Sequence, residues 1–122
     1  MECLRERLGD AAPHATLLDG CGLSYGNTAS AQDMARYLNA MLKTPVGAVF
    51  LRSFKDSAPG GIHAKVKTGT VAVARTLVGY LEVPGKRWTF AILCNKGDSP
   101  SVWWAPPLRD KLLEEMARAM KR

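Results

Sequence analysis

The chain has 122 residues, 47% of them hydrophobic and 23% charged, which is the composition of one globular domain with a modest core. No run of about 18 apolar residues is present to span a membrane, and the first five residues lack the basic-then-apolar order of a signal peptide. The net charge of +6 favours anionic partners such as cell-wall polymer or nucleic acid, although a basic solvated surface would give the same charge.

Cysteine and histidine usage gives no sign of a cofactor. The cysteines are Cys3, Cys21 and Cys94, an odd number without a CxxC spacing, so neither a disulfide framework nor a zinc site is indicated. His14 and His63 are far apart in the sequence and have no acidic cluster nearby. We therefore expect no metal and no cofactor.

The first half of the chain is expected to be helical. Residues 1–9 carry leucines at helical spacing. Ser30 is typical of a helix N-cap, Asp33 falls in the first turn, and apolar residues then recur at helical spacing to about residue 43. Pro45 should open a second short helix that ends near residue 54, followed by a glycine-rich and proline-rich loop at 56–61.

The second half changes to strands and ends in a helix. Strands are expected at 62–70, 76–83 and 88–94, with a hairpin turn at 84–86. The third strand is apolar almost throughout, as in a strand covered on both faces. A closing helix opened by Pro106 and Pro107 should cover one face with an apolar side made of Leu108, Leu112, Leu113, Met116 and Met120. The second cover need not lie in this chain.

These elements predict an α+β fold. We expect an antiparallel sheet of three strands with flanking helices, the closing helix on one face and the helices of residues 30–54 near one end. Residues 1–122 are interpreted as a single partial domain.

The most informative motif is Lys67-Thr68-Gly69, followed by Thr70, on the first expected strand. A lysine ammonium binds a carboxylate or assists proton transfer, and a threonine hydroxyl adds a directed hydrogen bond. A glycine lets an extended peptide approach the strand edge and pair with it. The backbone N–H of Thr70 is then placed to stabilise an oxyanion. A strand end ahead of a turn would account for the bare triplet equally well.

Three stretches together carry a family resemblance: 18–24 (Leu-Asp-Gly-Cys-Gly-Leu-Ser, with Asn27 following), 64–70 (Ala-Lys-Val-Lys-Thr-Gly-Thr) and 77–80 (Leu-Val-Gly-Tyr). The chain resembles the class C penicillin-binding proteins, which are D-alanyl-D-alanine carboxypeptidases and endopeptidases of the serine β-lactamase-like superfamily. The resemblance spans nearly the whole chain. It implies the C-terminal portion of a β-lactamase/transpeptidase-like domain.

The resemblance also implies a reaction, in which a serine attacks the D-Ala-D-Ala amide of a peptidoglycan stem peptide and water cleaves the acyl-enzyme. It assigns Lys67 a catalytic role, and places the substrate on a strand that includes Thr68, Gly69 and Thr70. Lys67 and Thr68 would hold the substrate carboxylate, and the Thr70 amide would serve the oxyanion hole. A possible cleft loop is formed by Asp19, Ser24 and Asn27.

Two family motifs are missing. No Ser-x-x-Lys occurs in this sequence, and no Ser-x-Asn precedes the 18–24 stretch. The segment 24–27 (Ser-Tyr-Gly-Asn) is one residue too long to replace it, and Cys21 stands where the family usually has serine. We therefore expect the isolated chain to be inactive and to depend on an upstream part of the same enzyme. The parent protein would be periplasmic or extracytoplasmic.

Two alternatives remain open. One is a small basic module that binds an anionic polymer, either nucleic acid or cell wall, through Lys65, Lys67, Arg75, Lys86, Arg87 and Trp88. Nucleic acid is the less expected partner, because the sequence has no recognisable aromatic-basic signature. The other is a non-catalytic relative that keeps the fold for binding.

Overall fold

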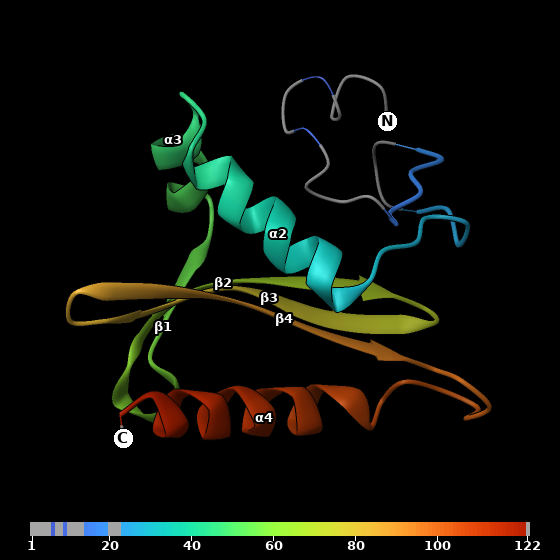
Figure 1. Ribbon diagram of the computed structural model, residues 1–122. Coiled ribbons are helices and arrows are strands. Elements are labelled where there is room, and N and C mark those ends of the chain that lie inside the picture. The colour runs from blue at the N-terminus through green and yellow to red at the C-terminus, as the bar shows by residue number, and fades with distance from the viewer. Residues whose placement is uncertain (1–5, 7–8, 10–13, 20–22, 122) are drawn as a thin grey trace.

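Four antiparallel strands form one sheet in the order β1-β2-β3-β4 (Figure 1). This computed structural model describes residues 6, 9, 14–19 and 23–121. The strands are β1 (Lys55–Ser57), β2 (His63–Val71), β3 (Ala74–Val83) and β4 (Lys86–Asn95). Most of the helix expected over residues 1–9, and the Cys21 position, lie outside the described residues.

Strand β1 corrects the expectation of three strands and of a loop at 56–61. It pairs with residues 64–66 of β2. Its sequence, Lys-Asp-Ser, has no apolar alternation from which a strand could be predicted, and it forms because β2 offers a free edge. A 3-10 turn, η1 (Pro59–Gly61), then leads into β2, with Gly60 at φ 57° and Gly61 at φ 80°.

Three described helices flank the sheet. The N-cap expected at Ser30 is confirmed: its hydroxyl accepts from the Asp33 N–H at 3.0 Å at the start of α2 (Ala31–Leu42). The second helix was expected to open at Pro45, and the short α3 (Gly47–Arg52) begins two residues later. Pro45 lies instead in a turn that precedes the helix, in which the Gly47 N–H donates to the Thr44 carbonyl. The last helix is α4 (Ala105–Met120).

Each face of the sheet has its own core. On one face, Leu81, Phe90 and Ile92 pack with Leu113 and Ala117 of α4. On the other, residues of β3 and β4 pack with α2 and α3, so that these helices lie across the sheet from α4 (Figure 1). Both faces of β4 are therefore covered by this chain. The helices of residues 30–54 were expected near one end of the sheet. They instead cover one of its faces.

The closing helix is rotated relative to its expected apolar side. Its buried positions are Ala105, Arg109, Leu113 and Ala117, with Met116 and Met120 partly buried against the same core. Leu108 and Leu112 were wrongly expected to face the sheet, and their exposed fractions are 54% and 46%. The small side chains of Ala105 and Ala117 let the helix approach the sheet closely along this line of buried residues.

The α+β class, with an antiparallel sheet and flanking helices, is confirmed. The hairpin expected near residues 84–86 is a two-residue turn between Val83 and Lys86, with Gly85 at φ 78°. Within the part of the chain that the structure describes, no helix is long and apolar enough to cross a membrane.

Candidate functional site

The Lys67-Thr68-Gly69-Thr70 segment lies on an open strand edge. Strand β3 pairs with β2 along its whole length, whereas β1 pairs only with residues 64–66. From Lys67 to Val71 the outer edge of β2 therefore has no partner strand among the described residues. Without a described strand partner, this edge can pair with an extended peptide through its outward backbone groups.

Lys67 is exposed, and no carboxylate among the described residues pairs with its ammonium. Its Nζ donates to the carbonyl oxygen of Thr68 at 2.9 Å, a local contact that uses one of three N–H groups. Within the described chain Lys67 forms no ion pair, in contrast to Lys65 on the same strand, whose Nζ lies 2.8 Å from Asp56 Oδ1. An ammonium at the start of an open edge is thus left for an external anion.

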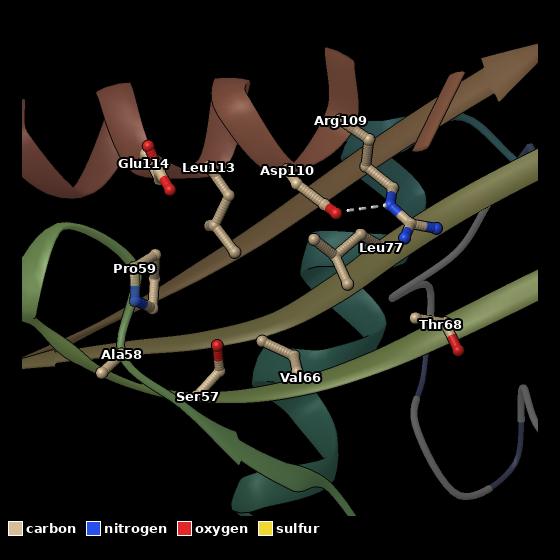
Figure 2. Close-up of a pocket in the computed structure, with 10 residues that line it drawn as sticks. All are labelled: Ser57, Ala58, Pro59, Val66, Thr68, Leu77, Arg109, Asp110, Leu113 and Glu114. Atoms are coloured by element: carbon tan, nitrogen blue, oxygen red, sulfur yellow. Dashed lines mark hydrogen bonds and ion pairs between the residues drawn. The ribbon is translucent and has the colours of Figure 1, made fainter. Parts of the chain in front are cut away.

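Thr68 lines a cavity of about 410 Å³ between β2 and α4, together with Val66, Leu77 and Leu113 (Figure 2). Lys67 does not line it. Consecutive residues of a strand project to opposite faces, so the two side chains expected to hold one carboxylate start from opposite sides of the sheet. They can share a ligand only if it lies in the plane of the strand edge.

A side chain at position 69 would clash with the neighbouring strand β3, which explains the glycine there. It lies opposite Thr76 of β3, and a Cβ built at Gly69 would overlap the Thr76 hydroxyl. The residue therefore makes room for its neighbour inside the sheet, besides leaving the edge unobstructed. Thr70 is exposed and lies opposite Arg75.

Hydrogen bonds within one loop bring together Asp19, Ser24 and Asn27. The Asp19 carboxylate accepts from the Ser24 N–H at 2.7 Å and from Asn27 Nδ2 at 2.9 Å. Asn27 Oδ1 accepts from the Leu18 N–H at 2.7 Å, and Ser24 Oγ accepts from the Gly26 N–H at 3.2 Å. These contacts shape the loop, and none of them brings a base to the Ser24 hydroxyl.

This loop lines a second cavity, of about 590 Å³, beside the β2–β3 turn. Asp19, Ser24 and Asn27 line it with Val71 and Val73, among others. Lys67 lies earlier on β2 and does not line this cavity either. The structure thus places the loop next to the end of the motif-bearing strand, and not around Lys67 itself.

Arg109 is a candidate that the sequence reasoning missed. It is only 8% exposed, and it lines the same cavity as Thr68. Its Nη1 donates to the Thr76 carbonyl at 3.1 Å and its Nε lies 3.1 Å from Asp110 Oδ1 (Figure 2). The sequence did contain one indication of this: Arg109 lies four residues after Ala105 and four before Leu113, so a charged residue interrupts an apolar stripe of the helix.

Several basic residues proposed for polymer binding have internal partners. Arg87 Nη2 lies 3.2 Å from Glu82 Oε1. Arg75 donates to the Val71 and Ala74 carbonyls and lies over the Trp103 ring. Lys86 Nζ lies 3.9 Å from the centroid of the Trp88 ring.

His63 joins three strands through charged neighbours. Its Nε2 lies 3.0 Å from Asp56 Oδ1 on β1, and its Nδ1 lies 3.3 Å from Glu82 Oε2 on β3. Hydrogen bonds donated to Asp56 and, as the second cause, to Glu82 raise the pKa of His63, while hydrogen bonds from Lys65 and then His63 lower the pKa of Asp56. The group is exposed, so its contribution to stability is small.

No resident metal centre is assembled: the described part of the chain holds no group of three or more His, Cys, Asp or Glu side chains placed to bind an ion. The described residues thus form an open strand edge that begins at an ammonium without a described carboxylate partner, with a cavity on one side of the strand. Comparison with protein-family models, with curated proteins and with solved structures found no match to this chain.

Proposed function

We propose that this chain binds the carboxyl end of an extended peptide along the open edge of β2. In this proposal it is the substrate-binding, C-terminal portion of a serine-type D-Ala-D-Ala carboxypeptidase or endopeptidase that acts on peptidoglycan stem peptides. The observation that carries the proposal is the Lys67 ammonium, which has no carboxylate partner among the described residues and stands where the free edge begins.

The geometry of the edge supports one way of binding. A carboxylate in the plane of the strand would be approached by Lys67 from one face and by Thr68 from the other. Residues two apart in a strand direct their backbone groups to the same edge. The Thr70 N–H therefore shares an edge with the Thr68 carbonyl oxygen that accepts from Lys67. A peptide added to this edge would meet that N–H near its last amide bond.

The chemistry requires a nucleophile from another polypeptide segment, since this sequence has no Ser-x-x-Lys. Lys67 would hold the terminal carboxylate and favour proton transfer at the serine, and the Thr70 N–H would stabilise the oxyanion of the tetrahedral intermediate. The parent enzyme would then work outside the cytoplasm, where peptidoglycan is found. Purified chain should neither release D-alanine nor become labelled by a fluorescent penicillin.

Binding is tested by NMR titration of the ¹⁵N-labelled chain with diacetyl-L-lysyl-D-alanyl-D-alanine. We expect the largest amide shifts at residues 67–71, and weaker binding of the same peptide with a C-terminal carboxamide. Lys67→Met should weaken binding roughly tenfold or more, because it removes a charge-assisted hydrogen bond.

The matched control is Lys65→Met, on the same strand, whose ammonium already pairs with Asp56. It should leave the affinity unchanged. Equal binding of the acid and the carboxamide, or equal losses in both variants, would contradict the proposal. Tight binding of an oligonucleotide that falls steeply with salt would favour the basic polymer-binding module instead.

A further inference from the structure

The cavity between β2 and α4 has an apolar floor and a charged mouth. Val66, Leu77 and Leu113 line it, and the last two are each only 4% exposed. Figure 2 shows Leu113 and Asp110 pointing from α4 towards the strands. The volume of about 410 Å³ is at the low end of the range for small-molecule sites in proteins. The cavity can therefore hold a compact ligand that carries an apolar group.

Arg109 brings a buried positive charge to this cavity. Its side chain is only 10% exposed. Its Nε lies 3.1 Å from Asp110 Oδ1, and its Nη1 donates to the Thr76 carbonyl at 3.1 Å. Its Nη2 group has no partner among the described residues, although both of its N–H groups are hydrogen-bond donors. A buried guanidinium with unused donors favours a carboxylate, which it can bind through two parallel hydrogen bonds.

Two carboxylates stand at the mouth of the same cavity. Asp110 and Glu114 both line it from α4, with side chains that are 62% and 50% exposed. Of the two Asp110 oxygens, only Oδ1 contacts Arg109. Glu114 Oε2 lies 3.7 Å from Arg118 Nη2, whereas Arg118 holds Glu115 more closely, at 2.6 Å. Asp110 and Glu114 therefore keep the capacity to accept hydrogen bonds from a cation at the mouth.

The charges of the lining decide the class of ligand. A simple carboxylate would meet Asp110 and Glu114 without a compensating charge, and a simple amine would leave the unused donors of Arg109 without an acceptor. An α-amino acid carries its ammonium and its carboxylate on the same carbon, so two opposite protein charges 3.1 Å apart can contact both. Because Arg109 is buried and the two carboxylates are exposed, the ligand carboxylate lies inside and the ammonium at the mouth.

From these observations we infer that the cavity binds a free α-amino acid with an apolar side chain. Arg109 binds the carboxylate, Asp110 and Glu114 bind the ammonium, and the apolar floor receives the side chain. The inference does not rest on the proposed function, because Lys67 does not line the cavity. Thr68 is common to both sites, so variants of Lys67 and Glu114 are the ones that distinguish them.

The probe is L-leucine, titrated into the full ¹⁵N-labelled chain and followed by NMR. We expect saturable amide shifts that are largest at residues 66–68, 76–78 and 109–114. N-acetyl-L-leucine lacks the ammonium and L-leucinamide lacks the carboxylate. Each should bind roughly tenfold more weakly than leucine, because each loses a charge-assisted hydrogen bond. Equal affinities for the three compounds, or largest shifts in another part of the chain, would overturn the inference.

Glu114→Gln tests the ammonium contact at an exposed position. It should weaken the binding of leucine roughly threefold, without weakening that of N-acetyl-leucine. Glu115→Gln, at the adjacent residue, which does not line the cavity, is the matched control and should bind leucine as the parent chain does. Arg109→Gln should abolish leucine binding, and the comparison at Glu114 stands even if this buried variant does not fold. Equal losses in Glu114→Gln and Glu115→Gln would overturn the ammonium contact.

Lys67→Met separates this cavity from the strand edge. It should bind leucine as the parent chain does while losing affinity for the acyl-D-Ala-D-Ala peptide, and Glu114→Gln should show the reverse. Failure of leucine to bind, with peptide binding intact, would overturn this inference alone. Loss of leucine binding in Lys67→Met would overturn the assignment of the amino acid to the cavity.

Discussion

The Tyr80 hydroxyl donates a 2.6 Å hydrogen bond to the backbone carbonyl of Leu38, joining β3 to α2 through the core. Both residues are buried. Tyr80→Phe should destabilise the chain by about 1–2 kcal/mol, because it removes the bond and leaves a buried carbonyl with one partner fewer. Urea unfolding with an unchanged m-value measures this. Tyr25→Phe, at an exposed tyrosine, is the control and should change nothing.

Ionisation of Tyr80 should lower the free energy of unfolding at alkaline pH. Burial raises the pKa of Tyr80 from 10.0 to about 12. The fold therefore favours the neutral phenol, so this contribution is fully present below pH 10.0 and is lost as the pH rises towards about 12. Unfolding free energies across that window should decline more steeply for the parent chain than for Tyr80→Phe. Parallel curves would contradict the assignment.

Gly79 is required by a close approach of backbone. Its φ is 156°, and a Cβ there would overlap the Lys65 carbonyl oxygen and stand 2.9 Å from the carbonyl carbon. Gly79→Ala should cost roughly 3 kcal/mol or more, from strain and steric overlap together. Gly85→Ala, at φ 78° in open space, should cost only about 1–2 kcal/mol. Similar losses for the two variants, measured by urea unfolding, would refute the steric reason.

His63 should titrate above its ordinary value. Hydrogen bonds donated to the Asp56 and Glu82 carboxylates raise its pKa from 6.5, and Asp56 is the larger cause. Because the folded pKa is raised, its stabilising contribution is complete below about pH 6.5 and is lost as the pH rises through the folded value. NMR titration should show a larger drop of the pKa in Asp56→Asn than in Glu82→Gln. About 1 M salt should reduce both differences, and the reverse order would contradict the geometry.

Some features of the site could be predicted locally. The cap formed by Ser30 and Asp33 was predictable because its partners are three residues apart and need no other part of the chain. The strand that carries Lys67 and Thr68 was predictable from its composition, and the alternation of those side chains follows from any β-strand. Arg109 was not identified, because its role depends on the Thr76 carbonyl, 33 residues earlier in the sequence.

By itself, the amino-acid sequence determined the helices α2, α3 and α4, the strands β2, β3 and β4, a hairpin turn around Gly85 and the motif on β2, since these depend on residues close to one another in the chain. Only the tertiary structure decided that α2 covers the face of β4 opposite α4, that α4 turns Leu108 outward, and that β1 stops before Lys67. The reason is that strand order and helix rotation are set by packing between distant residues, and a local pattern is compatible with more than one such packing.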